Sequence, residues 1–392
     1  MKKQNQAKQN LRIRRIKIKI VGIGGGGAAI VSEVAKGVRG VSFSAVDCDE
    51  KCPVRDKNKV RMFQMGTELS GGFGTGMNPE LGEKIAQKEK ERMAKIFKGQ
   101  DLLILIASLG GGFGSGAAPV FAELARELKN ISLGIFTLPF RFEGEKKEKI
   151  AKTALAKLRS DLSGQIVISN ERVFQIIDKK TPLRKALNIL NKTIISLLSD
   201  LVDLISRPGL INIDFADLKT ILRGRGRLIW FGSAEKTGAN RAEEAIKAIF
   251  QNPLWPKPLF EVKRILFNIT GSKDLTLKEV QVLSKGVCDL NPRAKIIFGI
   301  SENPKYNGKI KIMLLAVGPE LKEEKTTKKS RAKEKGPEKK KRLLLKTKTE
   351  KPKSKTRRSA LEIKKEEKQA ELEQLSQEKE WEIPAFLRKR FK

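Results

Sequence analysis

Hydrophobic positions follow two different patterns along the first half of the chain. Residues 16–23 alternate apolar with mostly basic side chains, whereas Leu102–Ala107 is continuously apolar. The first pattern predicts a strand with one buried face and the second predicts a strand buried on both faces. Further strands are predicted at 41–46, 133–138 and 165–169, and helices at 28–36, 78–97 and 117–129. Strands alternating with helices favour an α/β domain with a doubly wound parallel sheet over residues 16–182.

A second pattern follows a long apolar-periodic stretch, Leu183–Ile205, which predicts a central helix within 183–208. Strands are then predicted at 228–232, 264–270, 294–300 and 309–317, with helices at 239–251 and 276–289. This order predicts a smaller α/β domain with a mixed sheet over 209–318, in which two consecutive late strands form a hairpin.

The two ends of the chain differ in composition from the rest. Residues 1–15 are polar and basic, and residues 319–379 are dominated by Lys, Glu, Thr and Ser. Both segments contain too few apolar residues to offset chain entropy, so we predict a disordered extension and a disordered basic linker. Residues 380–392 regain aromatic and apolar side chains, which predicts a partner-binding peptide. Its candidate contact residues are Trp381, Ile383, Pro384, Phe386, Leu387, Arg388, Lys389 and Arg390.

Composition restricts the chemistry. The chain has 81 basic and 45 acidic residues, which favours anionic partners such as a membrane surface or nucleic acid. The absence of histidine excludes Ser-His-Asp and Cys-His catalysis. Three scattered cysteines favour a reducing cytosol. Cys48 and Cys52 have the spacing of a metal clamp but lack a second pair or a histidine, so no metal site is predicted. No apolar run reaches the roughly 18 residues of a membrane span.

Three glycine-rich segments interrupt the pattern: 22–27, GGFGTG at 71–76 and GGFGSG at 111–116. The first fits G-x-G-x-x-G between a strand and a helix, with Asp47 about 20 residues further on, which alone suggests a dinucleotide site. Three such loops, each offering backbone N–H groups beside helix N-termini, instead favour a nucleoside triphosphate. Close packing of helices on the sheet is the alternative explanation of the glycines.

SLGGGFGSGAAPV at Ser108–Val120 resembles the tubulin signature of the FtsZ/tubulin family. Further segments resemble that family and follow its order along the chain: GFGTGMNPELG, PFRFEGEKK, NERVFQIIDKKTP, GLINIDFADLKT at Gly209–Thr220 and LFNITGSKDLTLKEV. WEIPAFLRKR resembles the recruitment peptide of its bacterial division proteins. The resemblance covers 16–318 and the tail.

The resemblance implies a GTPase that uses GTP and Mg²⁺, polymerises head-to-tail with itself and forms the bacterial cytokinetic ring. It further implies a cytoplasmic protein at mid-cell under the inner membrane, tied to a membrane adaptor by the C-terminal peptide. The basic linker is an additional candidate for anionic membrane or nucleic-acid contact.

The resemblance also assigns residue roles. The residues implied to bind the nucleotide are Gly24, Gly25, Gly26, Gly27, Ala28, Ala29, Gly74, Thr75, Gly76, Gly110, Gly111, Gly112, Gly114, Ser115, Gly116, Glu143, Lys147, Asn170 and Asn191. Asn212, Asp214 and Asp217 are implied to enter a neighbouring subunit's nucleotide site and orient the attacking water. From spacing alone, Asp214 is an N-cap and Asp217 an acid in the first turn of a helix.

Several positions depart from the family pattern. Phe113 stands where the signature has threonine, and Ser115 replaces a second threonine. Ala28 and Ala29 stand where glycine or asparagine is common, and Lys147 stands where an arginine provides a bidentate fork. An alternative function is an FtsZ-like structural filament protein with weak or absent hydrolysis. It is favoured by the changes at Ala28, Ala29, Phe113, Lys147 and Asn191, whereas Ser115 is a conservative change. An NAD-dependent oxidoreductase is a third alternative, supported by the first glycine run alone.

Asn191 matches an aspartate that reads guanine in the family. A carboxylate accepts two bonds from guanine's paired donors, whereas an amide presents one acceptor and one donor. We therefore expect binding that is weaker or less guanine-selective than the family norm, by about 1–3 kcal/mol. Titration with GTP, XTP and ATP checks this expectation. Tight GTP binding with strong rejection of XTP and ATP would contradict it.

Overall fold

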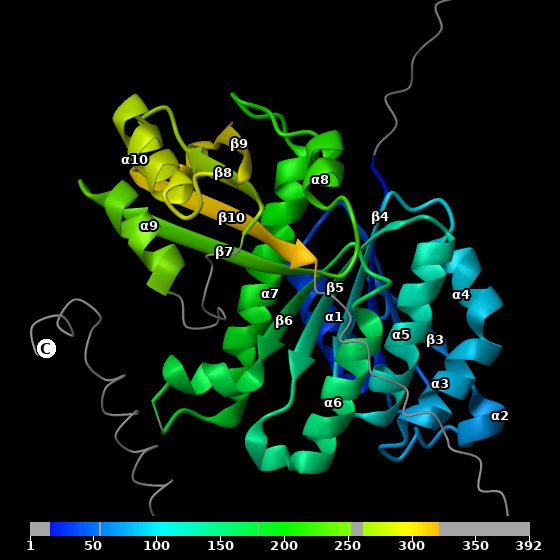
Figure 1. Ribbon diagram of the computed structural model, residues 1–392. Coiled ribbons are helices and arrows are strands. Elements are labelled where there is room, and N and C mark those ends of the chain that lie inside the picture. Colours follow the sequence, from blue (N-terminus) through cyan, green and yellow to red (C-terminus); the bar gives the residue numbers. More distant parts are fainter. Residues whose placement is uncertain (1–15, 55, 179, 252–261, 321–392) are drawn as a thin grey trace, which may run out of the picture. The chain divides into compact units, whose positions relative to one another are not determined.

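The computed structural model describes residues 16–54, 56–178, 180–251 and 262–320 (Figure 1). Six parallel strands form the first part of the sheet, in the spatial order β3-β2-β1-β4-β5-β6. Their bounds are β1 Ile18–Ile23, β2 Ser42–Asp47, β3 Val60–Gln64, β4 Leu102–Ser108, β5 Ile131–Leu138 and β6 Gly164–Ser169. Because the order reverses between β1 and β4, the sheet is doubly wound, as the sequence predicted.

The sheet continues into a mixed part with the order β7-β10-β8-β9. These strands are β7 Arg227–Thr237, β8 Arg264–Gly271, β9 Lys295–Glu302 and β10 Lys309–Glu320. The pairing of Gln165 with Leu228 joins the two parts. The predicted hairpin is wrong: β9 pairs with β8, in parallel, and β10 lies between β7 and β8, antiparallel to both. The reason is that α10 carries the chain from β8 to β9 as a crossover, which leaves β9 at the edge. The other edge of β9 forms one bridge, between Ile300 and Ile211.

Helices cover both faces of the parallel part (Figure 1). α1 (Gly24–Gly37) and α7 (Leu183–Ser206) pack on one face, and α3 (Pro79–Lys88), α4 (Lys90–Phe97), α5 (Gly112–Glu127) and α6 (Glu145–Leu158) pack on the other. The remaining helices are α2 (Thr67–Ser70), α8 (Phe215–Ile221), α9 (Arg241–Gln251) and α10 (Leu277–Cys288), with short 3₁₀ turns η1 (Arg141–Glu143), η2 (Asn170–Gln175) and η4 (Pro304–Tyr306). Within the described residues, no helix combines the length and apolar character needed to cross a membrane.

Successive residues of a strand point to opposite faces, and this alternation divides the core. On β4, Leu102, Ile104 and Ile106 pack in the cluster that contains α7, whereas Leu103 and Leu105 pack in the cluster that contains α5. The same alternation on β10 shares its residues between the α7 cluster and a third cluster under α9 and α10.

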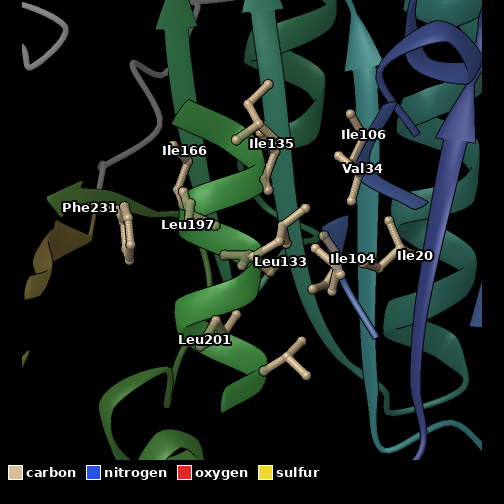
Figure 2. Close-up of a cluster of buried hydrophobic side chains, with 14 of the residues drawn as sticks. Ile20, Val34, Ile104, Ile106, Leu133, Ile135, Ile166, Leu197, Leu201 and Phe231 are labelled. Carbon is tan, nitrogen blue, oxygen red and sulfur yellow. The ribbon is translucent and has the colours of Figure 1, made fainter. Parts of the chain in front are cut away.

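The central helix α7 therefore contributes to a core shared by both parts of the sheet. Its Leu197 and Leu201 lie against Leu133, Ile166 and Phe231, which come from β5, β6 and β7 (Figure 2). Burial of such side chains contributes on the order of 1.5–3 kcal/mol each, so α7 holds the two parts together as one unit.

The boundaries differ from the sequence prediction at the glycine runs. Gly24–Gly27 and Gly112–Gly116, expected as turns, form the first turns of α1 and α5. The helix expected over 78–97 divides into α3 and α4 at Glu89. β3 was not predicted. The predicted extension at 1–15, linker and C-terminal peptide lie outside the described residues, apart from the end of β10.

Candidate nucleotide site

An open cavity of about 370 Å³ lies where β1 and β4 end, at the point where the strand order reverses. Ligands of doubly wound sheets bind in this crevice. The first turns of α1 and α5 border it, so the positive ends of two helix dipoles meet there. We call it the glycine cavity. Its lining includes Gly24, Gly25, Gly26, Gly74, Thr75, Gly76, Gly111, Gly112, Gly114 and Lys147.

The two similar hexapeptides are in direct contact. A β-carbon built on Gly112 would lie 2.2 Å from Thr75 Oγ1, and one built on Gly116 would lie 2.1 Å from the carbonyl oxygen of Pro79. The segment 71–76 leads through Asn78, the N-cap of α3, into the helix that packs on α5. The two hexapeptides therefore form adjoining walls of one cavity.

The structure requires glycine at several of these positions for two different physical reasons. Close packing requires Gly26, Gly27, Gly112 and Gly116, because a β-carbon at each would come within 2.5 Å of a neighbouring atom. A positive φ favours glycine at Gly24, Gly74, Gly76 and Gly110.

Gly25 and Gly111 have neither constraint. The nearest atom to a β-carbon on Gly25 is Asp47 Oδ2 at 3.5 Å, and none lies within 4 Å for Gly111. Packing thus explains part of the glycine pattern. It gives no reason for these two residues, which border the open cavity.

The predicted hydroxyl and charged residues form hydrogen bonds and an ion pair in the segments that border the glycine cavity. Ser115 is buried behind the cavity, and its Oγ accepts a hydrogen bond from the Gly110 N–H at 2.8 Å. Lys147 Nζ pairs with Glu143 Oε2 at 2.8 Å, and Glu143 Oε1 accepts from the Phe140 N–H at 2.9 Å. A lysine in place of arginine thus remains anchored at the cavity wall.

Phe113 does not fill the cavity. Its side chain is 4% exposed and packs in the apolar cluster of α3 and α5. The residue borders the cavity, so the substitution removes a hydroxyl without adding a bulky group to the open space.

A second cavity, of about 330 Å³, lies between α1 and α7. Ala29 and Asn191 of the prediction line it, together with Glu33, Arg184 and Leu187, which the sequence prediction missed. Pro53 connects the two sites, because it lines this cavity and lies 3.9 Å from a β-carbon built on Gly25. Ala28, the residue before Ala29, is buried in the core, and Asn170 begins η2 directly after β6.

Acidic side chains at the end of β2 also line the glycine cavity. Burial raises the pKa of Asp47, whose Oδ1 accepts from the Cys48 N–H at 2.8 Å. Burial, and next the Asp47 charge, raise the pKa values of the Cys48 and Cys52 thiols to about 12. Both thiols are therefore protonated at neutral pH. The position of Asp47 and Asp49 was predictable, since β2 ends beside β1.

Asn212, Asp214 and Asp217 lie away from the glycine cavity, around the start of α8. Asp214 caps this helix: an Asp214 carboxylate oxygen accepts from the Asp217 N–H at 2.8 Å, and an Asp217 oxygen accepts from the Asp214 N–H at 3.1 Å. Asn212 and Asp214 are exposed and Asp217 is half-buried.

The chain continues from α8 into residues 222–225, which share a depression with Gln100 and Ile131, at the start of β4 and β5. α8 thus leads to the amino-terminal edge of the parallel strands, whereas the glycine cavity lies at their carboxyl edge (Figure 1). One copy of the chain does not bring its own acids to its own cavity.

These features define a class: a doubly wound nucleotide-binding domain joined by a central helix to a second α/β domain. The family models agree, matching the Tubulin/FtsZ family GTPase domain over residues 17–178 and the FtsZ family C-terminal domain over 228–320. Cell division protein FtsZ of Coxiella burnetii (strain RSA 493 / Nine Mile phase I) is 33% identical over 304 residues, which cover 77% of this chain and 78% of that protein.

Solved structures give the same result. The empty FtsZ dimer of M. jannaschii matches with a TM-score of 0.71 and 31% identity, covering 79% of this chain and 90% of that one. GDP-bound CetZ1 from Haloferax volcanii shares the fold, with a TM-score of 0.65 and 19% identity over 77% of this chain and 94% of that one. The chain belongs to the tubulin/FtsZ family and is a GTPase, which confirms the family predicted from the sequence.

The contact between the twin hexapeptides generates a prediction. In Gly116→Ala the new β-carbon meets the backbone of α3, because Pro79 O and Glu83 N would lie 2.1 and 2.7 Å away. We expect a loss of about 1–3 kcal/mol in the free energy of unfolding, measured by urea denaturation. Gly111→Ala is the matched control, since no atom lies within 4 Å of its β-carbon and its φ is −83°. Equal stability of the two variants would contradict the packing argument.

Proposed function

We propose that this chain is an FtsZ-type GTPase that polymerises head-to-tail into filaments of the bacterial cytokinetic ring, and that GTP is hydrolysed at each subunit junction. One observation carries the proposal: the glycine cavity and the acids of α8 occupy opposite edges of the parallel strands. A head-to-tail contact would join them, and a contact of this kind propagates into an open filament.

In this mechanism, the N–H groups around Gly25 and Gly111 would hold the triphosphate, and the cavity between α1 and α7 would receive the guanosine. Asp214 and Asp217 of the next subunit, with Asn212, would orient the attacking water. Mg²⁺ would neutralise the phosphate charge; Asp49 and Thr75 offer oxygen ligands at the cavity, and Mg²⁺ commonly takes few protein ligands besides phosphates and water. Phosphoryl transfer depends mostly on such positioning and electrostatics.

Exposed apolar side chains support the two contact faces. Phe73 is 90% exposed beside the glycine cavity. Leu210 and Leu277 are 71% and 84% exposed, the first close to α8 in sequence and the second at the start of α10. Apolar groups of this size left in water are typical of protein interfaces. The similar FtsZ of M. jannaschii is itself a dimer.

A structural filament protein with little hydrolysis is the second candidate, and the lysine at 147 favours it because a point charge replaces a bidentate fork. The buried position of Phe113 weakens that candidate. Attachment to a membrane adaptor through 380–392 and a mid-cell position under the inner membrane complete the proposal as inferences from the family.

Phosphate release measured against protein concentration tests the proposal. We expect the turnover per subunit to rise above a threshold concentration, because the complete site exists only at junctions. Sedimentable filaments without phosphate release would favour the structural candidate, and turnover independent of concentration would contradict hydrolysis at junctions.

A mixing experiment tests the split site directly. Asp214→Asn keeps a good N-cap but removes the charge, and Gly25→Asp adds a carboxylate beside the phosphates at a position where a β-carbon fits. Each variant alone should hydrolyse GTP slowly. Mixed, they should exceed the sum of their separate rates, because some junctions combine an intact cavity with an intact Asp214. No gain on mixing would contradict catalysis in trans.

A further inference from the structure

The amino-terminal edge of the sheet carries a second open depression, of about 500 Å³. It lies between the starts of β4, β5 and β6 and the segment after α8. Lys129, Lys219, Arg223 and Arg225 line it, against a single acid, Asp101. Asp101 is engaged by the chain itself, because its Oδ2 accepts from the Lys17 N–H at 2.9 Å. We call this the basic depression.

The positive charge extends beyond the lining to Arg227 and Arg264. Arg264 caps the end of α8 by donating to the carbonyls of Thr220 and Ile221 at 3.3 and 3.1 Å. Burial, and next the charges of Arg227 and Arg223, lower the pKa of Arg264. Arg227 has a buried Nε without a hydrogen-bond partner among the described residues. Like charges are therefore held close together at this edge.

Carboxylates of the described residues form no ion pair with these side chains. Burial, and next the charge of Arg126, lower the pKa of Arg225, and the charge of Asp161 opposes this only in part. The nearby Asp161 forms its ion pair with Arg126 at 3.2 Å, and Arg225 donates to the carbonyl oxygen of Asp161 rather than to the carboxylate. None of Lys129, Lys219, Arg223, Arg225, Arg227 and Arg264 forms an ion pair within the described residues. An arrangement of this kind is costly unless an external anion approaches it.

The local sequence concentrates the charge. Arg223, Arg225 and Arg227 alternate with Gly224 and Gly226, whose φ values of +104° and +67° favour glycine. Lys129 has a φ of +58° directly beyond α5, in a conformation that glycine usually adopts. Its positive charge is also favourable beside the carboxyl-terminal end of α5.

Both ends of the described fold lie at this edge. Lys17, bonded to Asp101, follows a segment 1–15 that contains six Lys or Arg and no acid. Glu320, paired with Arg227 on β7, precedes 321–392, with 26 basic and 13 acidic residues. The chain thus joins its two most basic segments to the folded part close to the basic depression.

We propose that the basic depression binds the sugar-phosphate backbone of nucleic acid without reading its sequence. Arginine suits this partner because its guanidinium binds phosphate through two parallel bonds. A membrane is the less suitable partner, because insertion into headgroups needs apolar side chains. None of the large apolar residues exposed in the described part of the chain lines the depression. The contact is additional to GTP hydrolysis. Because the depression shares its edge of the sheet with α8, DNA binding is tested without nucleotide.

The test compares binding of the full-length chain, without nucleotide, to a short fluorescent DNA duplex over a range of salt concentrations. The test variant is the double substitution Lys129→Gly with Arg223→Gln. Both side chains are exposed, and glycine suits the positive φ at 129, so the fold should persist. Loss of two phosphate contacts should reduce the slope of log affinity against log salt by about 2. At physiological salt we expect roughly 30-fold weaker binding.

The matched control is Lys247→Gln with Lys278→Gln, which removes the same charge from exposed positions on α9 and α10. The control should bind DNA like the parent chain, and both variants should retain concentration-dependent GTP hydrolysis. Equal losses in variant and control would assign the binding to net charge or to the basic ends and overturn the proposal. Two other results would also overturn it: unchanged DNA binding with weaker binding to acidic vesicles, or loss of sedimentable filaments with unchanged DNA binding.

Discussion

The site depends on one constraint, the close approach of the first turn of α5 to α3 and to the first turn of α1. Backbone atoms there lie where any β-carbon would be, since one on Gly116 would sit 2.1 Å from Pro79 O and one on Gly24 would sit 2.9 Å from Gly114 N. This approach brings the N–H groups of two helix starts to one cavity, where they act as fixed positive ends. The conformational entropy that glycine loses on folding is offset by the apolar cluster beneath, to which Phe113 contributes its side chain.

The second determinant is the rigidity of the connection between the two edges of the sheet. α7 packs along the strands and shares its core with β5, β6 and β7, so the cavity at one edge and α8 at the other are parts of one folded unit. A hinge at Pro208 or in the loop before α8 could not carry Asp214 across the sheet without breaking this core. Separation therefore makes a second subunit necessary for the proposed chemistry. In the proposed mechanism, this separation would couple hydrolysis to assembly through geometry.

The parallel strands were predictable because buried strands produce long apolar runs. The family was predictable because the glycine segments are specific to it. It did not predict β3, a short edge strand in which Arg61 and Gln64 interrupt the apolar pattern. The hairpin prediction was wrong because the order of strands in a sheet depends on crossover connections. The hydrophobic period and the composition do not determine these connections. The glycine runs were expected as turns, since helix propensity disfavours glycine; in α1 and α5 tertiary contact overrides that preference. No sequence pattern marks Arg184 as a site residue, because its place in a cavity depends on how α7 packs against α1.

Asp214 and Asp217 show why spacing alone could not separate a structural role from a catalytic one. Each carboxylate accepts one bond from the other's backbone N–H, which completes a capping box worth about 1 kcal/mol to a short helix. A carboxylate has about four acceptor positions, so this bond leaves most of its capacity free. The cap also fixes the two side chains relative to each other before any neighbour arrives, which lowers the entropy lost when they orient a water molecule. The structural role is therefore compatible with the proposed catalytic one, and preorganises the acids for it.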